Sequence, residues 1–169
     1  MRIVMTVCYL IKDGRILLGL KKIRLGKGLW NGPGGRVEVN ETTQQAAVRE
    51  HEAESGLMPL RPTRYGLLRV TKVWDEEVIE LHIFRADEYR GDLRESDEMN
   101  CRWFPLREAP YVFQEIPLGQ MWGSDWHFLP ILLERRRFIG SVHFVTPQQI
   151  AQIQLEVVER LPECLPPED

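Results

Sequence analysis

Short runs of apolar residues, separated by turn residues, dominate the first part of the chain. The segment 3–11 is apolar and β-branched, the residues 12–14 read Lys-Asp-Gly, and the segment 15–20 resumes the apolar run. Two such runs around a glycine-containing turn are typical of a β-hairpin. We therefore expect a hairpin at the start of a central sheet.

Further apolar runs predict more strands, and the longest polar stretch predicts a loop. The segments 59–73 and 78–85 are strand-like, and the polar residues 74–77 between them predict a second hairpin. Shorter strands are expected at 101–104 and 141–145, and 85–99 is expected to be a loop.

Capping signals predict a helix at 42–55. Thr42 and Gln45 have the spacing of a capping box, and Gly56 stands where a helix would end. The apolar segment 125–136 predicts a second helix, which Pro130 breaks or shifts. Strands and helices together predict an α/β fold with a mixed sheet between helices.

The end of the chain is predicted to add a third helix at about 147–161. Thr146 would cap it and Pro147 would occupy its first turn. Four apolar residues would share the face that packs on the domain: Ile150, Ile153, Val157 and Leu161. The proline-rich, acidic residues 162–169 are expected to fray.

Composition favours one globular domain that spans residues 1–169. The chain has 169 residues, of which 43% are hydrophobic, enough to bury roughly two-thirds of the unfolded surface. A net charge of −3 disfavours a nucleic-acid polymer as partner and favours a divalent cation if phosphates are bound. The spacing of Cys8, Cys101 and Cys164 indicates neither a metal site nor a disulfide framework. We expect a monomeric, cytoplasmic protein without a membrane partner.

Acidic side chains gather on one face of the helix predicted at 42–55. At about 100° per residue, Glu54 lies roughly 40° round from Glu50, and Ala53 roughly 60° the other way. Two like charges one turn apart repel, which a divalent cation offsets. The Gly-rich loop 30–35 lets backbone groups approach a ligand. The pattern predicts a Mg²⁺ site, with Mn²⁺ as a substitute, that binds phosphate.

The competing interpretation is a solvated acidic stretch, which the glycines and Arg49 around it disfavour. Arg49 is predicted to belong to the catalytic set with Glu50 and Glu54, as an internal partner of Glu41 or of a ligand carboxylate more than as a reacting group. His51 is turned about 100° from Glu50 and is expected at a polar edge. Either Glu50 or Glu54 is the better candidate for a general base.

The spacing of these residues resembles the signature of the Nudix family. Its fixed positions are occupied here by Gly35, Glu41, Arg49, Glu50, Glu54 and Gly56. The pattern departs from the family at Ala53, where the family has a glutamate. The resemblance implies the Nudix fold, and the departure implies a vacant position on the metal-facing side.

Segments outside this signature resemble the oxidised-purine nucleoside triphosphatases of the same family. They are LLGLKKIRLGKGLWNGPGGRVEVNET, ESDEM, CRWFPL and MWGSDWHFLPILLERRRFIG. The resemblance implies hydrolysis of oxidised purine nucleoside triphosphates to the monophosphate and pyrophosphate, which cleans the nucleotide pool. A small nucleotide is then the substrate.

The same resemblance implies the residues that bind metal and substrate. The implied metal ligands are the carbonyl of Gly34 and the carboxylates of Glu50, Glu54 and Glu98. The implied substrate-binding residues are Thr6, Lys21, Asn31, Trp122 and Asp125. Ser124 stands where the family has a first aspartate, and Leu25, Val70 and Lys72 replace pocket aromatics. These departures are expected to broaden or shift the base preference.

Two alternatives remain from the sequence. The loss of a carboxylate at Ala53 favours a nucleotide-binding protein with weak or no catalysis. The changes at Leu25 and Ser124 favour a hydrolase of another nucleoside diphosphate derivative.

Overall fold

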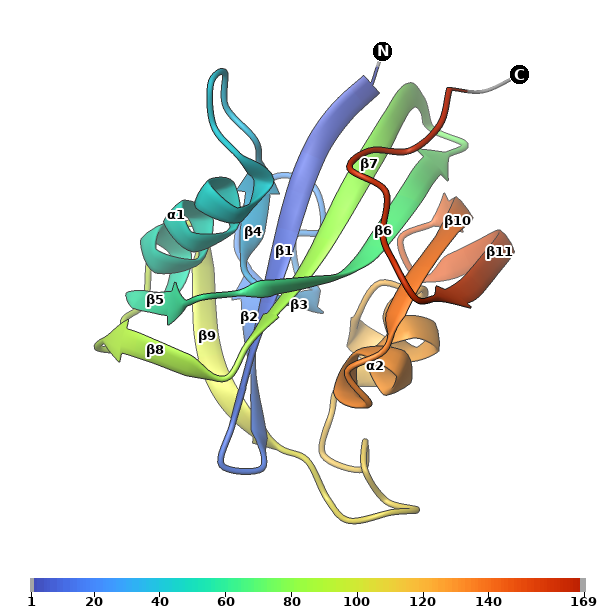
Figure 1. Cartoon of the computed structure of the whole chain (residues 1–169). Coiled ribbons are helices and arrows are strands. Elements are labelled where there is room, and N and C mark those ends of the chain that lie inside the picture. The colour runs from blue at the N-terminus through green and yellow to red at the C-terminus, as the bar shows by residue number, and fades with distance from the viewer. Residues whose placement is uncertain (1, 168–169) are drawn as a thin grey trace.

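The computed structural model describes residues 2–167, which form one large mixed sheet with a helix on each side (Figure 1). The helices are α1 (Thr43–Ser55), α2 (Asp125–Leu133) and the short 3₁₀ helix η1 (Leu118–Gln120). The first six strands are β1 (Arg2–Lys12), β2 (Arg15–Lys21), β3 (Trp30–Asn31), β4 (Gly34–Arg36), β5 (Leu57–Leu60) and β6 (Thr63–Lys72). The others are β7 (Asp75–Ala86), β8 (Glu88–Gly91), β9 (Met99–Pro105), β10 (Arg137–Thr146) and β11 (Gln149–Val158).

The main sheet has nine strands in the path β11-β10-β6-β7-β1-β2-β3, with β4 paired to β1 and β9 to β2. Strands β1 and β7 run parallel, as do β6 and β10, and the other pairs are antiparallel. The predicted hairpins 3–20 and 59–85 are both present. The predicted α/β class with a mixed sheet between helices is confirmed.

Alternation along β1 explains why helices cover both faces. Val7 and Tyr9 pack in the core that contains Phe128 of α2, whereas Cys8 and Leu10 pack in the core that contains Ala47 of α1. Successive side chains of a strand point to opposite faces, so an uninterrupted apolar run requires cover on both sides. Within residues 2–167, no helix is long and apolar enough to cross a membrane.

Local signals define both ends of α1 as the sequence predicts. The Thr42 hydroxyl accepts a hydrogen bond from the Gln45 N–H, and the Gln45 side chain accepts one from the Thr42 N–H. Gly56 ends the helix with a φ of 81°, the left-handed conformation that favours glycine. Ala46 and Ala47 are fully buried, so α1 can approach the sheet closely.

The expectation that His51 lies at a polar edge is wrong. Its side chain is fully buried, and Nδ1 lies 2.8 Å from the carbonyl oxygen of Leu57 and 3.0 Å from Oγ of Ser55. Burial lowers the pKa of His51 to about 4. His51 therefore joins the end of α1 to the start of β5 as a neutral ring.

The prediction of a helix at 147–161 is wrong, because this segment contains the strand β11, which pairs antiparallel with β10. The residues 152–157 read Gln-Ile-Gln-Leu-Glu-Val, and this period of two is the signal that the spacing of Ile153 and Val157 obscured. Thr146 accepts a hydrogen bond from the N–H of Gln149 across the hairpin turn, where a helix cap was expected.

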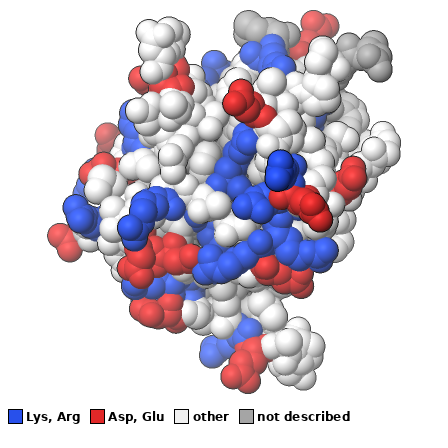
Figure 2. Space-filling view, viewed as in Figure 1, with Lys and Arg blue, Asp and Glu red and all other residues white. Residues whose placement is uncertain are grey.

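The residues after β11 fold back onto the sheet, so the expected fraying is wrong up to residue 167. Arg64 donates hydrogen bonds to the carbonyls of Pro162 and Glu163, and the N–H of Leu165 donates to Glu80. Figure 1 shows this tail crossing β6 and β7, and basic side chains gather near the centre of this face (Figure 2). The expected loop 85–99 is also partly wrong, because it includes β8, which pairs with β5.

A buried polar cluster underlies the tail. Glu80 forms an ion pair with Arg2 and accepts hydrogen bonds from Nε2 of His82 and the N–H of Leu165. Nη1 of Arg64 lies 3.0 Å from Nδ1 of His82, and Nε2 of His82 lies 2.8 Å from Glu80. A neutral ring with its proton on Nε2 satisfies both contacts. Burial and the charges of Arg64 and Arg2 lower the pKa of His82 to about 4.

Acid should therefore destabilise the fold through His82. Between its ordinary pKa of 6.5 and about 4, the ring binds a proton in the unfolded chain and not in the folded one. The free energy of unfolding should fall by about 2 kcal/mol more in the wild type than in His82→Gln between pH 7 and pH 5. Urea unfolding at the two pH values measures this difference, and equal losses in both proteins would contradict the assignment.

Candidate active site

A cavity of about 410 Å³ opens between the sheet, the start of α2 and the Gly-rich loop. Its lining includes all but two of the site residues predicted from the sequence: Thr6, Lys21, Asn31, Gly34, Glu50, Glu98, Trp122 and Asp125. Glu54 lies buried beside it, 3.9 Å from the ammonium of Lys21. Arg49 is hydrogen-bonded to Glu50 and lines a different groove. Segments far apart in the sequence thus converge on one cavity.

The Gly-rich loop reaches this position because two of its residues lack side chains. A Cβ atom at Gly34 would lie 2.0 Å from the carbonyl oxygen of Thr6, and one at Gly35 would lie 2.5 Å from Cδ of Glu50. Real Cβ atoms essentially never approach so closely. Glycine therefore lets β4 pair with β1 while it packs against the carboxylate of Glu50.

Arg49 holds Glu50 in place. Its guanidinium donates to both carboxylate oxygens of Glu41, over 2.6 and 2.9 Å, and Nη1 donates to Glu50 over 2.6 Å. The pKa of Glu41 is lowered mainly by its hydrogen bond from Arg49. The predicted pairing of Arg49 with Glu41 is confirmed. Arg49 acts on the site by orienting Glu50.

The carboxylate of Glu54 is the polar group near the glycine loop that most needs a ligand. Its side chain is 3% exposed, and neither carboxylate oxygen has a hydrogen-bond partner in the described protein. Burial raises the pKa of Glu54 to about 7; Lys21 opposes the rise, and Glu50 and Glu98 add to it. Lys21 lies 3.7 Å from Glu98 and so bridges the two acids.

This donor set fits a divalent cation. Within residues 2–167 no three His, Cys, Asp or Glu side chains already converge as ligands. A buried carboxylate without a partner nevertheless has a high desolvation cost, which a cation would offset. Glu50, Glu54, Glu98 and the Gly34 carbonyl are the nearby groups that would offer the oxygen ligands that Mg²⁺ prefers.

The opposite end of the cavity is aromatic with a few polar groups. Trp122 packs edge-on against Phe144, with ring centroids 5.0 Å apart. Asp125 is 4% exposed, and its Oδ2 has no hydrogen-bond partner in the described protein. Burial raises the pKa of Asp125 to about 8, so its carboxyl group is mostly protonated at neutral pH. Such a group both donates and accepts hydrogen bonds.

Asn31 presents a donor to the cavity at this end. Its Oδ1 already accepts from the N–H of Gly32 over 2.9 Å and from the hydroxyl of Tyr9 over 3.3 Å. These two bonds fix the orientation of the amide, so Nδ2 is left to donate to a ligand. The flat aromatic wall and the polar groups together suit a nucleobase.

Sequence reasoning left several wall residues unassigned. Met5, Leu81, Phe128 and Phe144 also line the cavity. In the strands, the period-two alternation identifies the face on which Met5, Leu81 and Phe144 lie, but only the packed sheet shows which part of that face stays uncovered.

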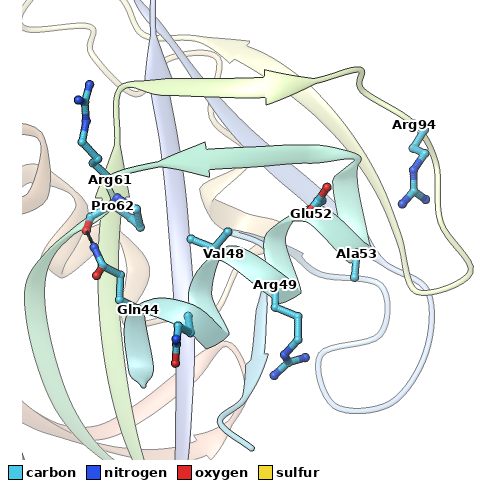
Figure 3. Close-up of a pocket in the computed structure, with 9 residues that line it drawn as sticks. Gln44, Val48, Arg49, Glu52, Ala53, Arg61, Pro62 and Arg94 are labelled. Carbon is cyan, nitrogen blue, oxygen red and sulfur yellow. Dashed lines mark hydrogen bonds between the residues drawn. The ribbon is translucent and has the colours of Figure 1, made fainter. Parts of the chain in front are cut away.

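The expected position of Ala53 on the metal-facing side is wrong. Ala53 is exposed and lines a separate groove on the outward side of α1, together with Arg49, Glu52 and Arg94 (Figure 3). Glu54, one residue further and about 100° round the helix, is buried instead. The absence of a carboxylate at position 53 therefore removes no group from the lining of the cavity.

Fold and site together define an α/β protein in which a glycine loop and an acidic helix form one end of a cavity of about 410 Å³. The profile described as NUDIX domain matches residues 1–130. The chain belongs to the Nudix family.

Relatives and solved structures agree with this membership. The chain is 39% identical to "Oxidized purine nucleoside triphosphate hydrolase" of Danio rerio, over 93% of this chain and 96% of that protein. It is 34% identical to the protein of the same name from Mus musculus, over 91% and 94%. The MutT structure from Bacillus halodurans superposes with a TM-score of 0.75 at 24% identity, over 91% and 97%, which supports the fold.

The buried Glu54 should make the metal-free protein less stable. Its carboxyl pKa is raised in the fold from 4.5 to about 7. Between these two values the unfolded chain releases a proton that the folded chain keeps, so stability falls as the pH rises and the full loss is present above about pH 7. In the presence of a chelator at pH 8, Glu54→Gln should raise the free energy of unfolding by about 2 kcal/mol. This gain in stability should become smaller towards pH 5. Urea unfolding measures it, with the exposed Glu52→Gln on the same helix as control. A less stable variant at both pH values would contradict the argument.

Proposed function

We propose that this protein is a Mg²⁺-dependent Nudix hydrolase that converts purine nucleoside triphosphates, oxidised ones included, to the monophosphate and pyrophosphate. The observation that carries the proposal is a single cavity with unpartnered carboxyl oxygens beside one end and at the other. Those of Glu54, buried next to the cavity, favour a cation, and Oδ2 of Asp125 favours a hydrogen bond from a ligand in the cavity. The names of the relatives from Danio rerio and Mus musculus support the same substrate class.

The acidic end would carry out the phosphate chemistry. Glu50, Glu54, Glu98 and the Gly34 carbonyl would hold the metal, which supplies charge neutralisation of the triphosphate and a more acidic water. The carboxylate of Glu50 or Glu54 accepts the proton of the attacking water. The water oxygen bonds to one of the two phosphorus atoms of the α–β bridge, the bridging P–O bond breaks, and the monophosphate and pyrophosphate are released. Arg49 keeps Glu50 oriented throughout.

The aromatic end would hold the base. Trp122 provides a ring face on which a purine stacks. Asn31 donates from Nδ2, and Asp125 both donates and accepts at the base edge. Ser124 replaces an acid of the family at this point, and its hydroxyl lies 3.5 Å from Oδ1 of Asp125. One acidic group in place of two accepts fewer arrangements of donors, so the base preference should differ from that of the relatives.

Purified protein with Mg²⁺ should release pyrophosphate from purine nucleoside triphosphates. A panel of dGTP, dATP, 8-oxo-dGTP and 2-oxo-dATP, assayed for the monophosphate, tests this. Glu54→Gln should lower kcat by about 100-fold or more, because charge stabilisation by one such group contributes roughly that factor. Chelation should abolish turnover. Tight nucleotide binding without any turnover would instead support the non-catalytic alternative.

Restoring the carboxylate of the family should have a small effect here. Ala53 lies outside the cavity, so Ala53→Glu should change kcat/KM by less than about tenfold, because its side chain starts from the outward groove. Glu52→Gln serves as the control for a charge change on the same exposed face. A gain of about 100-fold would contradict the structural placement and would identify position 53 as a metal ligand.

A further inference from the structure

Lys72 occupies a position at which the strand pattern requires an apolar residue. Leu68, Val70 and Lys72 follow one another on one face of β6, and the first two pack in the main core. The Lys72 side chain is only 1% exposed, and it lines the cavity. Lysine is almost never buried to this extent without a specific partner.

Lys72 lies at the aromatic end of the cavity. Its backbone pairs with Phe144 of β10, and the N–H of Val73 donates to the Phe144 carbonyl over 3.0 Å. The ring of Phe144 contacts Trp122, and both side chains line the cavity. Lys72 thus belongs to the wall of the cavity formed by β6 and β10, next to the expected position of the base.

The known partners of Lys72 leave part of its donor capacity unused. Nζ lies 3.0 Å from Oδ2 of Asp75 and 3.9 Å from Oε2 of Glu77. An ammonium has three N–H donors, and the second distance is beyond hydrogen-bond range. If the only role of the Lys72–Asp75 ion pair were to close the hairpin, the pair could lie on the exposed face of the sheet. There it would form equally well and would avoid the free-energy cost of burying the ammonium.

We propose that Lys72 is a specificity-determining residue that donates a hydrogen bond to an acceptor on the bound base, and so favours oxopurines over aminopurines. A carbonyl oxygen at the base edge accepts this bond, whereas an exocyclic amino group would face the ammonium donor to donor. Leaving buried donors unpaired is penalised, so such a site rejects the wrong base strongly. The inference rests on the proposed function and names the substrate class of the same site.

The ratio of kcat/KM for dGTP to that for dATP tests the inference. In the wild type this ratio should favour dGTP, and Lys72→Met should lower it by about tenfold or more, mainly through KM for dGTP. A merely structural role would lower both values together and leave the ratio unchanged. Asp75→Asn is the matched control, because it removes the partner and keeps the ammonium, so its ratio should stay near that of the wild type.

The double variant Lys72→Met/Asp75→Asn covers the case in which Lys72→Met fails to fold, because it leaves no carboxylate unpaired at position 75. It should show the same loss of preference. An unchanged ratio in a folded, active Lys72 variant, or a wild type that favours dATP, would overturn the inference and leave the proposed function standing. A wild type that hydrolyses no nucleotide would instead refute the proposed function itself.

Discussion

The close approach of β4 to both β1 and α1 is the constraint on which the site depends. No side chain fits between Gly34 and the backbone of Thr6, or between Gly35 and the carboxylate of Glu50. Strand β1 and helix α1 are thereby held in van der Waals contact with β4, and polar groups of these elements face one cavity. A larger residue at either glycine would displace β4 from β1 or Glu50 from Arg49. Backbone geometry thus sets the position of the acidic end before any ligand binds.

The second constraint is the cover on both faces of β1. Its alternating side chains fill one core under α1 and another under α2. The cavity lies where the second core is incomplete, between the strands and the start of α2. Its walls are therefore packed strands and a helix end, which hold Trp122 and Asp125 with little freedom. The apolar walls also account for the raised pKa of Asp125.

Local signals predicted α1 and the glycine loop, because caps, glycines and helical spacing act within a few residues. The segment of β11 fits a helix as well as a strand in its sequence, since the spacing of Ile153 and Val157 agrees with both periods and only pairing with β10 decides between them. The folded tail depends on Arg64, about a hundred residues earlier, and no local pattern encodes that contact. Ala53 was misplaced for a related reason. Its direction differs from that of Glu54 by about 100°, and the packing of α1 determines which of the two is buried.

Orphaned polar atoms link these packing constraints to ligand chemistry. Four buried side-chain atoms in the described chain lack hydrogen-bond partners: Nε2 of His51, both oxygens of Glu54 and Oδ2 of Asp125. Three of the four belong to groups at or beside the same cavity, whereas native proteins leave few such atoms anywhere. A phosphate ligand with its cation would satisfy Glu54 and leave Asp125 unpaired, and a free base would do the reverse. Only a ligand that has both parts compensates both ends, so the distribution of unsatisfied groups selects a complete nucleotide over either fragment.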